Sequence, residues 1–313
     1  MKFGFYLPNN GPNARPEPLA AIAMKGDALG FECMVANDHI LVPEQINSPF
    51  PYTVGGEFPG GGTGEYFEQL TLLTYLAGIT KQIRLITSVM IVPHRPPLLT
   101  AKILSTIDVL SRGRLTVGVG VGWMEEEFRA LGAPPFSERG VVTNEYIRAF
   151  IELWTSDNPT FSGEYCGFSD LVFLPKPVQD PHPPIWVGGH SRAALRRAAT
   201  LGNGWHPVGA LPASPLEPDD LSEKISLLNR YADEAGRDPE TLDISMKALL
   251  YDSTSSPDGP RRRFSGSTEE ILQDVQTYAH YGVTHLIFDI RGSDLNSALE
   301  KLQWFAEDIM AHA

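Results

Sequence analysis

Cysteine is scarce in this chain of 313 residues: only Cys33 and Cys166 occur, far apart and each in an apolar or aromatic stretch. They offer neither a disulfide framework nor the CxxC spacing of a metal site, which is typical of proteins in a reducing cytoplasm. Long apolar runs are missing too. No segment reaches about 18 uninterrupted apolar residues, and the first residues lack the apolar core of a signal peptide. We therefore expect a soluble, cytoplasmic protein with no membrane partner.

Acidic residues outnumber basic ones. The chain has 38 Asp and Glu but only 25 Lys and Arg, and its net charge is −13. Such a chain lacks the basic face that displaces counterions from nucleic acid, so we expect a small molecule as its partner. No HExxH or GxSxG motif occurs, and the glycine-rich stretch 60–64 lacks the Lys-Ser/Thr pair of a P-loop. The sequence therefore disfavours a metal site and a serine hydrolase.

Short β-rich runs alternate with helical patterns, which is typical of βα units around a parallel sheet. Eight such strands predict an α/β fold, a (β/α)8 TIM barrel. The length and a hydrophobic content of 42% suit a single domain over residues 1–313, with insertions at the C-terminal mouth of the barrel. The predicted strands are residues 3–7, 32–37, 84–91, 114–121, 184–188, 204–207, 242–250 and 284–290.

Several stretches interrupt the βα rhythm. Residues 40–66, 208–219 and 251–266 each follow a predicted strand, so we expect them at the mouth, where long loops usually form lids or substrate walls. A further insertion over 155–184 predicts a small hairpin with arms at 161–165 and 171–174. One predicted helix lies between Pro97 and Arg112. It carries one apolar face made of Leu99, Ile103, Ile107 and Leu110.

The strongest candidate site is the turn Gly188-Gly189-His190-Ser191, which joins a strand to a helix. Glycine lets the backbone approach a ligand closely, and the first helical turn offers unpaired N–H groups, so the turn suits a phosphate group. Ser191 adds a hydroxyl group. An ordinary βα turn that needs glycine for its backbone shape explains the pattern equally well.

Glycine recurs on the fourth predicted strand. Alternation places Gly118, Gly120 and Gly122 toward the barrel axis, just before Trp123. Three inward glycines leave space, which a nucleotide or close packing of the barrel would fill equally well. The spacing differs from the GxGxxG motif of dinucleotide-binding folds.

Asp38 and His39 follow the second predicted strand, where an imidazole with an adjacent acid is suited to move protons near neutral pH. A hydrogen-bonded strand end explains the pair more simply. Ser88 and Val89 lie in the third predicted strand and by themselves indicate only burial. The basic triplet 261–263 suits a solvated loop or a site that attracts an anionic tail, and the solvated loop is the favoured interpretation.

In combination, these features resemble the luciferase-like monooxygenase superfamily, and within it the actinobacterial branch of deazaflavin (coenzyme F420)-dependent oxidoreductases. The similarity spans nearly the whole chain. It is carried by Asn37-Asp38-His39, residues 101–114, Gly118 to Trp123 with Glu125 to Phe128, Pro175-Lys176-Pro177, residues 183–189 and Gly202 to Trp205.

The resemblance implies a cofactor that lies across the mouth with its phosphate at Gly188, Gly189, His190 and Ser191. It implies that Ser88-Val89 forms a bulge, often a non-proline cis peptide, behind the tricyclic ring. It also implies that His39 lies near the reactive centre and that Asp38 lies beside the polar edge of the cofactor. The remaining cofactor contacts it implies are Gly120, Gly122, Trp123 and Trp205.

Trp123 stands where related sugar-phosphate dehydrogenases have an acidic residue, which favours an apolar or aromatic substrate. The leading hypothesis is hydride transfer between F420 and a small organic substrate, with His39 handling the proton. The nearest rival uses reduced FMN and dioxygen as a monooxygenase. A non-catalytic flavin-binding barrel and an isomerase or aldolase that uses Lys176 or Lys247 are further alternatives. A homodimer is expected by analogy.

Overall fold

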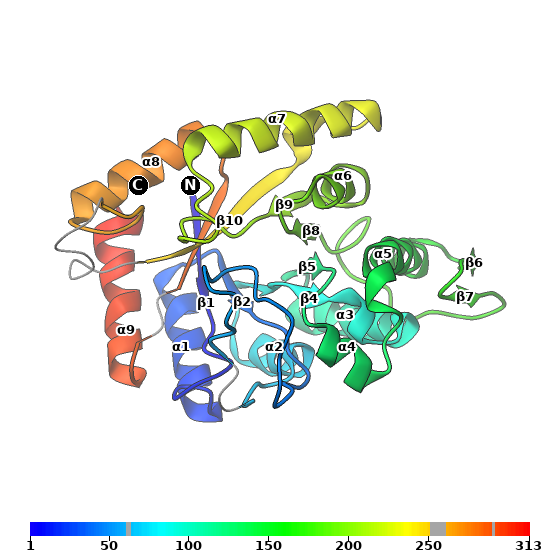
Figure 1. Cartoon of the computed structure of the whole chain (residues 1–313). Helices are drawn as coiled ribbons and strands as arrows, with labels where there is room; N and C mark the ends of the chain where they lie inside the picture. Colours follow the sequence, from blue (N-terminus) through cyan, green and yellow to red (C-terminus); the bar gives the residue numbers. More distant parts are fainter. Residues whose placement is uncertain (61–63, 251–260, 290–291) are drawn as a thin grey trace.

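The computed structural model describes residues 1–60, 64–250, 261–289 and 292–313. Parallel strands form a closed barrel with helices around it, a TIM barrel (Figure 1). The sheet closes because β3 pairs directly with β5. The barrel strands are β1 (Lys2–Tyr6), β2 (Cys33–Ala36), β3 (Arg84–Thr87), β4 (Met90–Ile91), β5 (Leu115–Gly120), β8 (Ile185–Gly188), β9 (Gly204–His206), β10 (Asp243–Leu249) and β11 (His285–Asp289).

The predicted barrel is confirmed, and every predicted strand except the third lies within one residue of its expected ends among the described residues. The third is split, because β3 and β4 are separated by Ser88 and Val89. Residues 61–63, 251–260 and 290–291 lie outside the described part of the chain, and with them parts of the predicted loops 40–66 and 251–266 and the end of the last predicted strand.

Helices alternate with the strands, and several of the helices begin with a capping residue. Ser191 accepts a hydrogen bond from the backbone of α6, and Ser267 forms a capping box with Glu270 at the start of α8. No helix in the described ranges is long and apolar enough to cross a membrane. The helices are α1 (Pro16–Leu29), α2 (Gln69–Ile79), α3 (Pro97–Ser111), α4 (Glu125–Leu131), α5 (Arg139–Thr155), α6 (Arg192–Leu201), α7 (Pro218–Glu234), α8 (Thr268–His280) and α9 (Leu295–Trp304), with short turns at η1 (Val92–His94), η2 (Phe136–Glu138), η3 (Pro239–Thr241) and η4 (Phe305–Met310).

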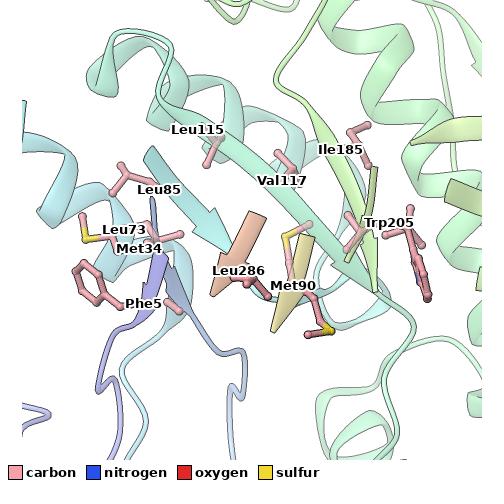
Figure 2. Close-up of a cluster of buried hydrophobic side chains, with 14 of the residues drawn as sticks. Phe5, Met34, Leu73, Leu85, Met90, Leu115, Val117, Ile185, Trp205 and Leu286 are labelled. Carbon is pink, nitrogen blue, oxygen red and sulfur yellow. The ribbon is translucent and has the colours of Figure 1, made fainter. Parts of the chain in front are cut away.

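The main hydrophobic core lies between the strands and the helices. Figure 2 shows core side chains such as Leu85, Val117 and Ile185 on neighbouring strands. Alternating residues of β5 divide as expected, with Leu115 and Val119 in this outer core. The inside of the barrel holds a smaller apolar cluster made of Cys33, Val35, Ile86, Trp186 and Ile287. Polar groups above this cluster therefore face the mouth.

The predicted hairpin needs a correction. β6 (Phe161–Ser162) pairs with β7 (Gly167–Phe168), and not with residues 171–174. The turn is short because the carboxylate of Glu145 accepts hydrogen bonds from the backbone N–H groups of residues 164–166. This hairpin projects beyond α5 (Figure 1).

The apolar face predicted for α3 is divided between core and surface. Ile107 is buried, but Leu99 is 57% exposed and Leu110 is 55% exposed. Smaller residues such as Ala101 bring α3 against the barrel instead. The exposed side chains leave an apolar stripe on the outside of the molecule.

Residues 261–263 lie in an exposed or half-exposed loop, as expected, but two of its arginines are ion-paired. Arg261 donates to both oxygens of the buried Asp274 carboxylate, at 2.7 and 2.8 Å, and Arg263 donates to one of them at 3.1 Å. Because of these bonds the pKa of Asp274 lies below its ordinary value, although burial alone would raise it. The triplet therefore fastens the chain to α8.

Candidate active site

The candidate residues come together at one end of the barrel, because the carboxyl ends of parallel strands meet there. His39 follows β2, Trp123 follows β5, and Ser191 follows β8. Ser88 and Val89 separate β3 from β4 at the same end. A cavity of about 450 Å³ also opens at this end, between the loop that follows β1 and the last residues of β10 and β11, and none of the candidate residues lines it.

Ser88 and Val89 form a bulge joined by a non-proline cis peptide bond. The bulge folds inward onto strands that carry glycine at the points of contact. A Cβ atom on Gly120 would lie 2.5 Å from Val89, and one on Gly188 would lie 3.0 Å from it. A Cβ on Gly118 would overlap the Thr87 carbonyl oxygen. The glycines therefore make room for the bulge, and the half-buried Val89 side chain is left at the mouth.

Gly122 has a different role from that of the two glycines before it. Its φ angle is +86°, in the left-handed region that favours glycine. A Cβ there would also lie 2.6 Å from the ring of Phe128. Gly122 therefore turns the chain from β5 toward Trp123 and α4.

A hydrogen-bonded network lies directly beneath the bulge, inside the barrel. Lys247 Nζ donates to the Ser88 carbonyl oxygen at 3.0 Å, and Ser88 Oγ lies 2.9 Å from His206 Nε2. His206 Nδ1 lies 2.9 Å from the Ser245 carbonyl oxygen, which only accepts, so the hydrogen of neutral His206 is on Nδ1. Burial, with the charge of Lys247, lowers the pKa of His206 to about 3. His206 is therefore neutral and accepts from Ser88.

His39 is held by Glu127 of α4. His39 Nδ1 lies 2.9 Å from Glu127 Oε2, and the carboxylate is almost fully buried. The other oxygen of Glu127 accepts hydrogen bonds from Ile40 N at 2.8 Å and Leu41 N at 3.3 Å. A carboxylate only accepts, so Nδ1 of His39 carries a hydrogen and Nε2 is the nitrogen that can exchange a proton with a ligand. Glu127 therefore fixes the orientation of the His39 imidazole.

Asp38 is a structural residue as the chain is folded here. Both its oxygens bind Arg95 at 2.8 Å, and one also accepts from Ile91 N at 2.8 Å. Burial alone would raise the pKa of Asp38, but these bonds lower it below its ordinary value. Arg95 also binds Glu68, which caps α2. Asp38 therefore links β2, β4 and α2, and its carboxylate is fully buried.

Four aromatic side chains cover His39. The rings of Phe58 and Tyr66 lie 5.0 and 5.1 Å from the imidazole, and that of Trp123 lies 6.2 Å from it. Phe50 packs on Trp123 at 5.1 Å. We call Phe50, Phe58, Tyr66 and Trp123 the aromatic cover. Apart from Trp123, it is supplied by the insertion 40–66.

The insertion is fastened to the first turn of α4. Glu126 accepts hydrogen bonds from the backbone of Asn47 and Ser48 and from the Ser48 hydroxyl group, at 2.8 to 3.2 Å. These bonds also hold the pKa of Glu126 below its ordinary value. Successive glutamates of α4 thus hold the cover and His39 in place.

The turn after β8 has the geometry of an anion site. Gly189 adopts a φ of +97°, and its carbonyl oxygen accepts from the buried indole of Trp205 at 2.8 Å. Ser191 caps α6 by accepting a hydrogen bond from Ala194 N, and residues 191–193 are exposed, so the first turn with its remaining N–H groups lies at the surface. His190 accepts from Val208 N, and burial followed by the charge of Lys224 lowers its pKa to about 4. The hydrogen bond from Trp205 to Gly189 thus helps to fix the conformation of the turn.

The site thus fits a phosphorylated tricyclic cofactor. The backbone amides at the start of α6 suit its phosphate, and the bulge of Ser88 and Val89, which packs on glycines, suits its ring. Glu127, Arg95 and the three aromatic residues that the insertion 40–66 adds to the cover escaped the sequence analysis as parts of the site, and Lys247 was named there only for the isomerase or aldolase alternative. For Glu127 there was a signal, since three successive acids follow Trp123 at the start of a helix. Nothing local shows which of the three faces His39.

Comparison with known proteins gives a consistent result. A family model described as luciferase-like monooxygenase matches residues 1–285. An FMNH2-dependent dimethylsulfone monooxygenase of Pseudomonas putida is 36% identical over 240 residues, which cover 68% of this chain and 66% of that protein.

Solved structures share the fold over nearly the full length. The monooxygenase RslO1 of Streptomyces bottropensis has a TM-score of 0.80 at 22% identity and covers 100% of this chain and 99% of its own. An F420-dependent secondary alcohol dehydrogenase, solved with an F420-acetone adduct, has a TM-score of 0.75 at 19% identity with the same coverage. At sequence identities this low, the structural similarity shows a common fold and nothing beyond it.

Proposed function

From the premise that this chain belongs to the luciferase-like monooxygenase family, a family of oxidoreductases, we propose that it transfers a hydride between coenzyme F420 and a small apolar or aromatic organic substrate. The observation that carries the proposal is the His39–Glu127 pair, enclosed by the aromatic cover at the mouth of the barrel. Exchange of a hydride with an alcohol or carbonyl group also requires a proton, and this pair is built to move one.

The cofactor would be held at two places at the mouth of the barrel. The first-turn amides of α6, reached through Gly188, Gly189 and His190, would bind its phosphate. The bulge of Ser88 and Val89 would support its ring. Bound F420 supplies hydride chemistry, which belongs to the cofactor and not to the protein.

His39 acts at Nε2. Because Glu127 keeps a hydrogen on Nδ1, neutral His39 offers a free electron pair at Nε2 and takes a proton from an alcohol, and protonated His39 returns it to a carbonyl oxygen. The cover excludes water from this exchange, and its rings favour an apolar substrate over a sugar phosphate. Trp123 contributes directly to this selectivity.

A second function is favoured by one specific observation, the similarity to the FMNH2-dependent dimethylsulfone monooxygenase. In this alternative, reduced FMN and dioxygen insert oxygen into the substrate in the same site. A deazaflavin lacks the ring nitrogen on which flavin oxygen chemistry depends, so the two functions require different cofactors. The phosphate turn accepts either.

Anaerobic titration with each cofactor, followed by a substrate screen, tests the proposal. Tight binding of F420 with weak binding of FMN supports hydride transfer, and the reverse supports the monooxygenase. Binding of a cofactor with no effect of His39 substitutions on any reaction would support a non-catalytic carrier. An aldolase or isomerase is disfavoured because Lys176 is bonded to backbone carbonyls of Leu153 and Ser156, and Lys247 lies beneath the bulge.

We also propose that the chain is one domain over residues 1–313, acts in the cytoplasm and forms a homodimer. The two cysteines are unpaired, as suits a reducing compartment. The exposed apolar stripe of Leu99 and Leu110 on α3, together with the exposed Tyr75 on α2, which packs against α3, supports the dimer. Light scattering of the wild type and of Leu99→Glu measures it, and a monomeric wild type would contradict it.

A further inference from the structure

His94 lies behind the pair of His39 and Glu127, and the proposed reaction does not use it. It ends the short turn η1, and its side chain is only 2% exposed. Among the described residues, neither Nδ1 nor Nε2 of His94 has a hydrogen-bond partner. Its ring packs instead against that of Phe128, with ring centres 4.7 Å apart. A buried N–H without a partner costs free energy, so the presence of a histidine here needs an explanation.

Glu127 lies between the two histidines. Its Oε2 is 2.9 Å from His39 Nδ1, and its Oε1 is 3.8 Å from His94 Nδ1. The second distance is too long for a hydrogen bond, but in a buried site it still gives a substantial electrostatic interaction. The Glu127 side chain is 1% exposed, and within the described residues its ion-pair partners are these two histidines. One buried carboxylate is therefore shared by two imidazoles.

His94 is the neutral member of this group. Burial lowers the pKa of His94 below its ordinary value, although the charges of Glu127 and Asp38 would raise it. Arg95 also faces His94, but it is paired with Asp38 at 2.8 Å, so that the charges of these two groups largely cancel. His94 is therefore uncharged near pH 7.

The carboxylate selects which nitrogen of neutral His94 carries the hydrogen. With the hydrogen on Nδ1, the N–H dipole turns its positive end toward Glu127 Oε1. With the hydrogen on Nε2, the electron pair of Nδ1 would face the carboxylate and be repelled by it. The first arrangement is favoured, and its dipole opposes part of the pull that Glu127 exerts on a proton at His39.

We propose that His94 is a positioning residue that acts through Glu127: its neutral Nδ1–H stabilises the carboxylate from behind and keeps His39 from holding a proton too tightly. The inference rests on the proposed function, because it concerns the proton that His39 exchanges there. His94 itself stays neutral while the proton moves between the substrate oxygen and His39 Nε2. A base that also has to release its proton works best when it binds that proton neither too tightly nor too weakly at the working pH.

Nitrogen NMR of histidine-labelled protein, titrated without cofactor, measures the pH at which half of His39 is protonated. His94→Leu removes the N–H at a similar side-chain volume. His39 should then bind its proton about twofold to fivefold more tightly, which raises the midpoint by roughly 0.3–0.7 pH units. His94→Phe, which keeps a ring against Phe128, should give the same shift. His94→Asn keeps an N–H near the position of Nδ1 and should stay close to the wild type.

His285→Leu is the matched control. Its Nδ1 also lies 3.8 Å from a carboxylate, that of Asp243, and its side chain is also buried. However, His285 begins β11, at the end of the barrel opposite to the mouth. This variant should leave the midpoint of His39 unchanged. An unchanged or lower midpoint in His94→Leu and His94→Phe would overturn the inference. So would an equal shift in His94→Asn, because the N–H would then not be responsible.

The titration of the protein alone separates this inference from the proposed function. A protein that shows the expected shifts but binds neither F420 nor FMN would contradict the proposed function and leave the coupling between the histidines intact. In the active holoenzyme, the acid limb of the pH dependence of turnover should move in His94→Leu by the same amount as the midpoint. An acid limb that stays fixed while the midpoint moves would refute the role of His94 in the reaction.

Discussion

Replacing Glu127 by glutamine should reverse the hydrogen positions on His39. The side-chain carbonyl oxygen of glutamine can still accept from Ile40 N and Leu41 N, which bind one oxygen of the carboxylate. Its NH2 group then faces His39 Nδ1, which has to accept instead of donate. Nε2 consequently carries the hydrogen, and neutral His39 has no free electron pair toward the mouth.

The expected changes in stability and in rate follow from these hydrogen bonds. Glu127→Gln keeps the three hydrogen bonds, one of them reversed, but loses the charge of the carboxylate, and should lower the free energy of unfolding by about 1–2 kcal/mol. Glu127→Ala leaves three donors without an acceptor and should cost about 3–5 kcal/mol. Loss of a general base reduces rates by about 10²- to 10⁴-fold, so we expect substrate oxidation by Glu127→Gln to slow within that range at nearly unchanged cofactor affinity.

Nitrogen NMR of histidine-labelled protein measures the tautomer without any substrate. The His39 signals are those lost in His39→Gln. We expect a protonated Nδ1 in the wild type and a protonated Nε2 in Glu127→Gln, and stopped-flow kinetics then show whether the rate follows. The same tautomer in both proteins, or wild-type turnover by Glu127→Gln, would refute the reasoning.

Three further outcomes are expected. His39→Ala should cut turnover about 10²- to 10⁴-fold with cofactor affinity preserved, and a loss of binding with normal turnover would contradict this. Gly120→Ala should displace Val89 and weaken cofactor binding by isothermal titration, whereas Gly78→Ala, where a Cβ meets nothing within 4 Å, should not. Burial holds the pKa of His190 near 4, so between pH ~6.5 and ~4 the unfolded chain binds a proton that the folded chain does not. His190 should therefore make the free energy of unfolding, measured in urea, roughly 3 kcal/mol smaller at pH 4 than at pH 7. If the free energy of unfolding of His190→Asn depended on pH as steeply as that of the wild type, this reasoning would be wrong.

Local patterns in the sequence were sufficient for the barrel. Alternation of short apolar strands with helices depends on nearest neighbours along the chain, and the strand bounds agree with it to within one residue outside the bulge. The same reasoning placed His39, Trp123 and Ser191 at one end, because all parallel strands point the same way. The exposed face of α3 shows the limit, since periodicity reveals an apolar face but not what covers it.

The chemistry of the site depends on contacts between distant residues. His39 and Glu127 are 88 residues apart, and Ser88 and Lys247 are 159 residues apart. No spacing rule connects such pairs, because they meet only after the strands take their order around the barrel. Asp38, interpreted with His39 as part of the site, is likewise bonded to a residue 57 positions away, Arg95.

The amino-acid sequence by itself determined which segments become strands and helices and at which end of the barrel the candidate site residues lie, since both follow from local periodicity and chain direction. Only the tertiary structure decided which polar groups are paired and which remain available. Hydrogen bonds and desolvation act over a few ångströms in space, whatever the separation along the chain.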